Sequence, residues 1–391
     1  MALRRYYSGR DFRRAVNIEE LRRVAARRIP AFAFEYVEGG AEDELALERN
    51  RLAFDHWHFV PRTLISTEHR HLRMRLFGIE QPMPLVIAPT GLNGMLRHHG
   101  DLQLARAAAR AGIPFALSTV SNVRAAEAVQ AGGGRVWMQL YVLRDRRIAD
   151  DIVSRAADAG CEALVFTSDA NVFGLREWDR RSYSAPGVPT WRHVLDAGLH
   201  LRWLFDVVFP HGLPRFVNVA DFLAPEHRSA RKGVLAVPAL FDASISWDDV
   251  ARLRDRWPRR LVIKGVLDPA DVERAIRLGC DGVVLSNHGG RQLDSSVAPL
   301  EMLPEIARAF RDRITILVDS GFRRGSDIAK AMALGAHAVL IGRATLYGLA
   351  AGGEAGVERA LAILVSETDR VLGQLGCCSL ADLRRQHLHG A

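Results

Sequence analysis

Short runs rich in Val, Ile and Leu alternate along the chain with longer amphipathic stretches whose apolar residues recur at helical spacing. Such runs are typical of parallel strands that are buried on both faces and connected by helices. We predict eight strands, at Leu85 to Ala88, Phe115 to Leu117, Val136 to Leu140, Ala163 to Phe166, Leu261 to Ile263, Gly282 to Leu285, Thr315 to Val318 and Ala338 to Ile341. The predicted helices are Asp101 to Ala111, Val123 to Ala131, Asp145 to Ala159, Trp247 to Trp257, Pro269 to Leu278, Pro299 to Phe310, Gly325 to Leu334 and Gly353 to Leu375. Eight strand and helix repeats predict an α/β fold, the closed (β/α)8 TIM barrel.

Two segments fall outside this repeat, although we expect a single domain over residues 1–391 with the barrel at about 85–375. Residues 1–84 are predicted to form an N-terminal helical extension, with a helix from Ile18 to Glu38. A long insertion after strand 4, at about 177–246, far exceeds the ~4–6 residues of an ordinary loop. We interpret it as a lid, an interaction surface or a mobile loop.

Residues 190–209 of the insertion combine aromatic and aliphatic side chains with arginines and histidines. This composition is typical of an amphipathic helix that lies in a membrane interface. The same pattern also suits a helix that packs on the barrel or on a neighbouring subunit, and periodicity does not decide between the two.

Composition indicates a globular protein, with 48% hydrophobic and 25% charged residues. The net charge is +8, and among the 53 basic residues only Lys232, Lys264 and Lys330 are lysines. The arginines are dispersed among acidic residues, which disfavours nucleic-acid binding. The positive field that remains favours anionic substrates, phosphates and acidic lipids.

The four cysteines show no CxxC spacing, so we expect a reducing compartment and no metal site. The basic N-terminus is not followed by the apolar region of a secretory signal, and no apolar run reaches the ~18 residues of a membrane span. We therefore expect a cytoplasmic protein or one attached peripherally to a membrane.

Polar or glycine residues follow nearly every predicted strand, at the edge where barrels of this kind carry their active sites. They are Pro89-Thr90-Gly91, Ser118, Gln139 with Tyr141, Thr167 with Asp169, Lys264, Ser286-Asn287-His288, Asp319-Ser320-Gly321 and Gly342-Arg343. Each alone could be ordinary turn chemistry. All of them together predict a functional site at this end of the barrel.

The richest of these segments, residues 286–294, reads SNHGGRQLD. His288 could act as a general base with a pKa near neutrality, and the planar guanidinium of Arg291 could bind a carboxylate. Asp169 could orient His288 and stabilise its imidazolium form. The structural alternatives are a capping loop with a solvated arginine, and a turn or N-cap role for Asp169.

Lys264 ends a strand that reads LVIK, so its ammonium group is expected deep in the barrel. It must either form a Schiff base or pair with an anionic group, because an unpaired buried charge is too costly. A Schiff base would indicate covalent catalysis by the lysine, whereas an ion pair would make Lys264 a fixed positive charge.

Residues 319–327, DSGFRRGSD, are followed by Gly342-Arg343 and resemble the phosphate site that barrels build after strands seven and eight. Arg323 and backbone N–H groups would hold the phosphate. We expect Arg324 to be solvated or to have a structural partner.

The motif SNHGGRQLD, with PTGLNG, GIPFALSTVSN, DSGFRRGSDI and GRATLYGLA, resembles the FMN-dependent 2-hydroxy acid oxidase and dehydrogenase family. The likeness extends from about Ile18 to Cys377 and is weakest in the insertion. It implies tightly but noncovalently bound FMN, oxidation of an L-2-hydroxy acid to the 2-keto acid, and a homotetramer.

The resemblance also implies a role for each matching residue. The substrate and catalytic residues would be His288 as base, Asp169 as its support, Tyr36, Arg176 and Arg291 on the carboxylate, and Tyr141 on the substrate oxygen. Lys264 would stabilise negative charge on the reduced flavin, so no Schiff base is expected. The remaining flavin contacts would be Pro89, Thr90, Gly91, Ser118, Gln139, Thr167 and Ser286 on the ring, Asp319 on the ribityl chain, and Gly321, Arg323, Gly342 and Arg343 on the phosphate.

Three positions near the expected substrate narrow this interpretation. Val120 stands where short-chain oxidases often have tryptophan, which implies a roomier pocket for an aromatic side chain such as that of mandelate. Phe173 could line the same pocket. Gly91 stands where the oxidases commonly have alanine, which implies a dehydrogenase that passes electrons to a quinone or another carrier.

In a mandelate-oxidising member of the family, the segment at this place anchors the protein to a membrane. The resemblance therefore implies peripheral membrane contact through about 190–209, at the cytoplasmic face of the inner membrane. The alternatives are an L-lactate dehydrogenase, a broad oxidase that uses oxygen, a Schiff-base lyase using Lys264, and a noncatalytic nucleic-acid or lipid-binding protein. The sequence does not decide between hydride transfer and a carbanion route.

Overall fold

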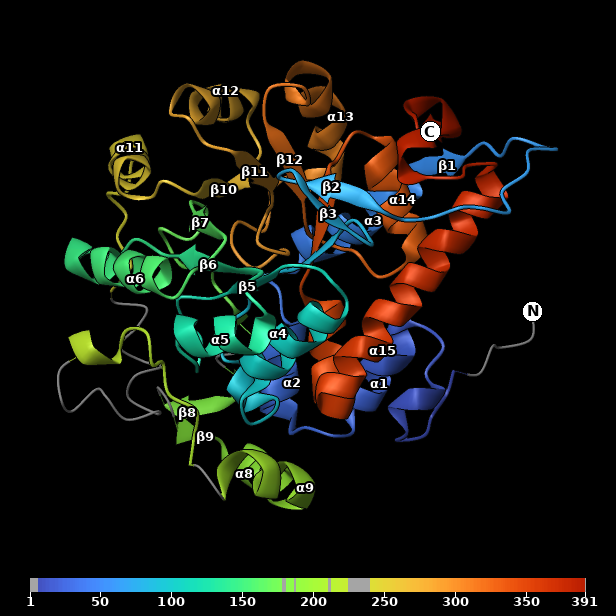
Figure 1. The fold of residues 1–391 in the computed structure, drawn as a ribbon. Helices are drawn as coiled ribbons and strands as arrows, with labels where there is room; N and C mark the ends of the chain where they lie inside the picture. Colours follow the sequence, from blue (N-terminus) through green and yellow to red (C-terminus); the bar gives the residue numbers. More distant parts are fainter. Residues whose placement is uncertain (1–5, 178–180, 186–187, 210–211, 224–239, 391) are drawn as a thin grey trace.

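The computed structural model describes residues 6–177, 181–185, 188–209, 212–223 and 240–390. Eight parallel strands form a closed barrel at the centre of the molecule, which confirms the predicted fold (Figure 1). Around the barrel they are β4 (Leu85–Ile87), β5 (Phe115–Leu117), β6 (Val136–Leu140), β7 (Ala163–Thr167), β10 (Arg260–Val266), β11 (Gly282–Leu285), β12 (Thr315–Val318) and β13 (Ala338–Ile341). Pairing of β13 with β4 closes the ring.

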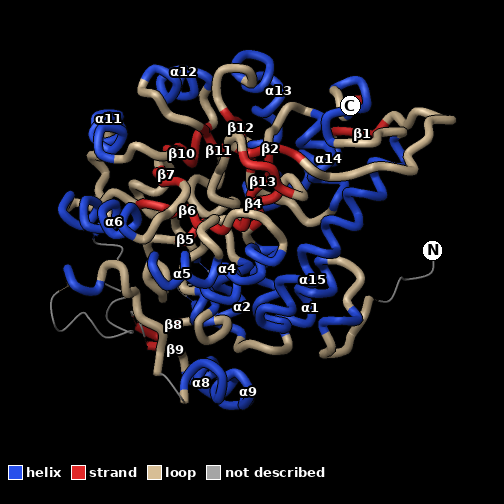
Figure 2. Tube along the Cα trace, in the orientation of Figure 1, coloured by secondary structure: helices blue, strands red, loops and turns tan. Residues whose placement is uncertain are grey.

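Helices surround these strands (Figure 2). They are α4 (Gly100–Arg110), α5 (Ala125–Gly132), α6 (Arg146–Asp158), α11 (Trp247–Arg256), α12 (Pro269–Arg277), α13 (Pro299–Phe310), α14 (Gly325–Ala333) and α15 (Arg343–Leu375). The predicted bounds hold closely except for the last helix, which begins at Arg343 rather than at Gly353. Gly353 has a φ of 63° and kinks the helix, and the residues before it are also helical.

Alternate strand residues divide between two cores, as the two-residue period of a strand requires. The barrel interior holds Val86, Trp137, Val165, Val262, Val284, Leu317 and Leu340, while the other faces pack against the helices. The hairpin of β2 (Met74–Leu76) and β3 (Ile79–Gln81) brings Phe77 to within 5.7 Å of the fully buried Trp137 ring. Apolar packing thus fills the interior, and the polar strand ends gather at the opposite end.

The N-terminal extension contains α1 (Ile18–Ala26), α2 (Ala31–Glu38) and α3 (Leu45–Asp55). The prediction of one helix from Ile18 to Glu38 is wrong, because the first helix ends at Ala26 and a second helix, α2, begins after its N-cap, Pro30. Proline lacks an N–H and disfavours the helical conformation in the preceding residue. This interruption allows α2 to approach the carboxyl ends of the barrel strands, here called the barrel mouth. Tyr36 on α2 lines the cleft there.

The insertion contains β8 (Tyr183–Ala185), β9 (Val188–Pro189), α8 (Trp191–Leu199), α9 (Leu201–Trp203), the π-helix η3 (Leu204–Val208) and η4 (Ala220–Phe222). Residues 178–180, 186–187, 210–211 and 224–239 of the predicted insertion lie outside the described residues. The α8 and α9 helices project from the side of the barrel (Figure 1).

The stretch at 190–209 is helical, as predicted, and it has apolar residues on two sides. Trp203 and Val207 are buried against the rest of the molecule. Trp191, Leu199 and Phe205 are exposed by 71%, 75% and 64%. Across the described residues, no helix combines the length and apolar character needed to cross a membrane.

Candidate active site

The carboxyl ends of the barrel strands open into one cleft. Most of the predicted site residues line it, namely Tyr36, Pro89, Thr90, Gly91, Ser118, Val120, Gln139, Tyr141, Thr167, Arg176, Lys264, His288, Arg291, Asp319, Gly321, Arg323, Gly342 and Arg343. Asp169 and Ser286 lie behind the lining and are both hydrogen-bonded to His288. The structure thus brings the whole predicted set together.

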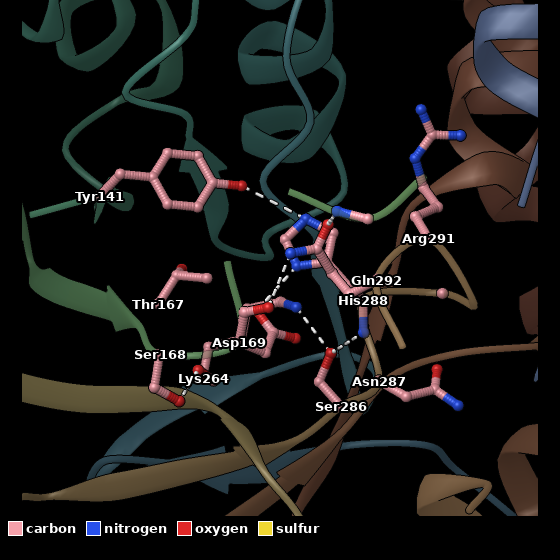
Figure 3. A network of polar contacts seen from close by, with 12 residues as sticks. Tyr141, Thr167, Ser168, Asp169, Lys264, Ser286, Asn287, His288, Arg291 and Gln292 are labelled. Atoms are coloured by element: carbon pink, nitrogen blue, oxygen red, sulfur yellow. Dashed lines mark hydrogen bonds and ion pairs between the residues drawn. The ribbon is translucent and has the colours of Figure 1, made fainter. Parts of the chain in front are cut away.

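His288 lies between Asp169 and Tyr141 (Figure 3). Its Nδ1 is 2.8 Å from Asp169 Oδ1, and its Nε2 is 3.3 Å from the Tyr141 hydroxyl. A proton on Nδ1 that is donated to the carboxylate leaves Nε2 as an acceptor. This arrangement gives the imidazole the orientation of a general base.

Opposing effects set the protonation of this pair. Burial lowers the pKa of His288, and the carboxylate of Asp169 offsets only part of that effect. Burial alone would raise the pKa of Asp169, but His288 and Lys264 outweigh it and lower that pKa. A neutral imidazole beside an ionised carboxylate is therefore the resting state near pH 7.

The backbone around His288 is held in an uncommon conformation. His288 has a φ of 57°, and its N–H donates to Ser286 Oγ at 3.0 Å. Gln292 Nε2 donates to the Asp169 carbonyl at 2.7 Å and joins the two loops. Gly265, with a φ of 100°, lies so close that a Cβ there would be 2.7 Å from Asp169 Cβ. These contacts fix the histidine and the aspartate relative to each other.

Lys264 is buried at the end of its strand and forms an ion pair. Of the two alternatives that the sequence left open, a Schiff base or an anionic partner, the structure shows the second. Lys264 Nζ lies 2.9 Å from Asp319 Oδ2 and 2.7 Å from Ser286 Oγ. Burial alone would lower the pKa of Lys264, but the carboxylates of Asp319 and Asp169 outweigh it and raise that pKa. The lysine is a fixed positive charge on the cleft wall rather than a nucleophilic amine.

A row of buried polar side chains continues along the same wall. Gln139 Nε2 donates to Thr167 Oγ1 at 2.9 Å, and Gln139 Oε1 accepts from Ser118 Oγ at 3.2 Å. These residues come from the ends of three neighbouring strands, so the barrel itself sets their spacing. They provide hydrogen-bonding groups for a planar polar ligand.

The far end of the cleft is built for an anion. Gly342 is the N-cap of α15, whose first N–H groups have no partner within the helix. Arg323 lies on the neighbouring loop and lines the cleft. The Arg343 guanidinium donates to the carbonyls of Val37, Gly39 and Gly289, which leaves its backbone N–H for the predicted phosphate contact. Arg324 pairs with Glu367, in line with the expected structural role.

Two further arginines lie at the cleft entrance. Arg291 Nη1 donates to the Gly39 carbonyl at 2.5 Å, and its guanidinium lies over the Tyr36 ring at 5.2 Å. Arg176 contacts the Phe173 ring at 5.2 Å, and its Nε is 3.5 Å from the Arg291 carbonyl. Tyr36 donates to the Gly91 carbonyl at 3.3 Å. Both guanidinium groups thus line the cleft, as the sequence predicted.

Sequence reasoning missed several residues that build the site. Asn50 on α3 exchanges two hydrogen bonds with Asn287, and Gln292 fixes Asp169. Phe241, at the end of the insertion, lines the cleft. SNHGGRQLD contains Asn287 and Gln292, but nothing near Asn50 or Phe241 in the sequence indicates a contact with the site.

A closed barrel whose strand ends hold an oriented histidine, a buried cation and a phosphate-type helix terminus suits an oxidoreductase with a phosphorylated cofactor. The chain belongs to the FMN-dependent dehydrogenase family, which matches residues 25–390. It is 45% identical to (S)-mandelate dehydrogenase of Pseudomonas putida over 95% of this chain and 93% of that protein. It is 41% identical to L-lactate dehydrogenase of Caulobacter sp. (strain K31), over 94% and 97%.

Solved structures agree with this assignment. The crystal structure of the monotopic membrane protein (S)-mandelate dehydrogenase superposes with a TM-score of 0.92 at 44% identity and covers 97% of this chain and 100% of that one. A mandelate oxidase mutant with (S)-mandelic acid gives a TM-score of 0.78 at 34% identity, over 96% and 98%.

The cleft fits the FMN that the family requires. The polar row and Lys264 match a flavin ring that gains negative charge on reduction, and the α15 terminus with Arg323 matches a phosphate. Gly342 lines the cleft, and a Cβ there would have its nearest neighbour, Thr90 Cγ2, at 3.8 Å and would occupy cleft space. The chain is therefore an FMN-dependent dehydrogenase whose residues can hold the cofactor.

Proposed function

We propose that this enzyme, which oxidises a 2-hydroxy acid with FMN, acts on an L-2-hydroxy acid with an aromatic side chain, (S)-mandelate being the candidate, and forms benzoylformate. The main support is the apolar side of the cleft, where Val120, Phe173 and Phe241 line the wall and provide surfaces that an aromatic ring can contact. The similarity to (S)-mandelate dehydrogenase supports the same substrate.

We propose that the substrate carboxylate binds Arg176, Arg291 and Tyr36 at the entrance. Guanidinium groups bind carboxylates through paired, charge-assisted hydrogen bonds, which fix the acid in one orientation. With the carboxylate held there, the hydroxyl of the substrate faces His288 and Tyr141. This orientation also determines which enantiomer presents its hydrogen to the flavin side of the cleft.

In the proposed reaction His288 Nε2 takes the hydroxyl proton, and Asp169 stabilises the imidazolium that forms. Tyr141 donates to the substrate oxygen, because burial raises its pKa and keeps the phenol protonated. FMN, when bound, would accept the two electrons of the oxidation together with the hydrogen of the substrate α-carbon. Lys264, held in place by Asp319, would provide a positive charge that stabilises the negative charge gained by the reduced flavin.

We further propose that the electrons pass to a quinone or another carrier, and that the protein attaches peripherally to the cytoplasmic face of a membrane. The exposed Trp191, Leu199 and Phe205 of α8 to η3 support this attachment, as does the likeness to a monotopic membrane protein. A homotetramer is also proposed. Sedimentation with anionic vesicles and the mass of the detergent-free particle test these two points.

The substrate proposal is tested by anaerobic reduction of the bound flavin. (S)-Mandelate should bleach the flavin faster than L-lactate at equal concentration, and admitted air should restore the colour slowly. Faster bleaching by lactate would favour the second candidate, an L-lactate dehydrogenase, which the 41% identity to the Caulobacter enzyme supports. Rapid return of the colour in air would indicate an oxidase.

A further inference from the structure

Phe241 forms part of the cleft wall, although it lies at the end of the insertion in the sequence, a few residues before α11 (Trp247–Arg256). Its side chain is 7% exposed. The ring centroid lies 5.0 Å from that of Tyr141 and 4.8 Å from that of Phe173, in a tilted and an edge-to-face arrangement. Both geometries are favourable for aromatic pairs.

The backbone behind this ring is anchored to the loop after β6. Phe241 forms an isolated bridge with Leu143, and its carbonyl accepts from Arg144 Nε at 3.1 Å. The next residue, Asp242, pairs with Arg146, which also binds Asp249 on α11. The end of the insertion is therefore fixed to the barrel, and the position of the Phe241 ring is fixed with it.

Phe241 lies between Phe173 and Tyr141, which the proposed mechanism places on different sides of the substrate. Phe173 carries the Arg176 guanidinium over its ring at 5.2 Å, on the carboxylate side. Tyr141 reaches His288 at 3.3 Å, on the hydroxyl side. Phe241 touches both aromatic rings and has no polar group, so it faces the part of the substrate that is neither carboxylate nor hydroxyl.

We propose that Phe241 determines the specificity for the substrate side chain by contacting its atoms beyond the β-carbon. This inference rests on the proposed function and adds to it, because it assigns one wall of the side-chain pocket to the insertion. The methyl group of lactate ends at the β-carbon and does not gain from this wall. The ring of mandelate and the chain of 2-hydroxyhexanoate extend past that point.

The test compares Phe241→Leu with the wild-type holoenzyme on (S)-mandelate, L-2-hydroxyhexanoate and L-lactate. We expect kcat/KM to fall on the order of tenfold for the two longer acids, mainly through KM, and to change by less than about threefold for lactate. The bound flavin spectrum should be unchanged. Phe216→Leu is the matched control, because Phe216 is also 7% exposed and lies in the insertion but not on the cleft.

Equal losses on all three acids, or the same change of selectivity in Phe216→Leu, would overturn the proposal. Phe241→Ala, which removes more of the wall, should enlarge the selectivity change if the proposal is correct. Wild-type preference for lactate over mandelate would contradict the proposed substrate, whereas the role of Phe241 is then still decided by the ratio of hydroxyhexanoate to lactate. Failure of the proposed substrate and failure of the proposed role of Phe241 therefore give different results in this experiment.

Discussion

The barrel mouth and the insertion differ in which kinds of side chain they bury and which they expose. At the mouth, charged side chains are buried and paired, as in Lys264 with Asp319 and His288 with Asp169. On the insertion, apolar side chains such as Trp191 and Phe205 are exposed. The barrel mouth is organised for chemistry on a small anion, and the helices of the insertion carry an exposed apolar surface.

The two regions nevertheless touch through the inner side of the insertion helices. Asp196 accepts from the Ala31 N–H at 2.7 Å, at the start of α2, and Trp203 donates to the Met95 carbonyl at 2.8 Å. Asp206 pairs with Arg97 at 2.5 Å. The insertion thus supports the helix that carries Tyr36 and the loop that follows Gly91, without entering the catalytic pair.

The largest expected effect comes from the base at the mouth. His288→Gln removes the proton acceptor, and we expect kcat to fall by about 10²–10⁴-fold. Anaerobic flavin reduction measures this directly, and the flavin content provides the control for folding. Near-normal reduction in this variant would mean that another group takes the proton.

Asp169→Asn should lower kcat by about 10²–10³-fold, because the imidazolium loses its partner. The pH profile gives a sharper result. Burial lowers the pKa of His288, so the wild-type kcat/KM should fall only below the ordinary imidazole range as the pH drops. Asp169 raises that pKa, so its removal should move the acid limb to still lower pH. A shift to higher pH would contradict this assignment.

Lys264→Met removes the positive charge and leaves Asp319 buried without its partner. We expect kcat to fall by about 10²-fold and the protein to lose about 3–5 kcal/mol of stability. Flavin reduction and urea unfolding measure the two effects. The double variant Lys264→Met with Asp319→Asn should regain stability without regaining rate, and recovery of both would show that the lysine has only a structural role.

The smallest effect is expected where the insertion meets α2. Pro30 gives this helix no side-chain cap, and Asp196 supplies an acceptor instead. Asp196→Ala should raise KM by about threefold and leave kcat nearly unchanged, because Tyr36 is less well positioned. Asp196→Asn keeps an acceptor oxygen and should behave like the wild type. A kcat loss larger than that of Lys264→Met would remove the distinction between the two regions.

The sequence predicted the mouth well because each of its residues follows a strand, and strand ends must meet in a closed barrel. The apolar runs located the strands correctly. The start of α15 was predicted at Gly353, but this glycine with positive φ lies at a kink within the helix, which begins at Arg343. Pro30 marked a break that the apolar period of the first helices concealed.

The contacts that the sequence could not reveal are those between distant segments. Phe241 reaches Tyr141 only because the end of the insertion is bound to the loop after β6. Asn50 reaches Asn287 only because α3 packs beside the mouth. Neither residue is in a motif, and both depend on how the chain returns to the barrel.

The most direct test of the division between chemistry and surface is a variant with Trp191→Ser, Leu199→Ser and Phe205→Ser together. These exposed residues are outside the cleft. We predict that the variant no longer sediments with anionic vesicles, while anaerobic flavin reduction by (S)-mandelate stays within about twofold of the wild-type rate. A reduction rate that falls together with vesicle binding would contradict the account, because the surface would then be part of the catalytic machinery.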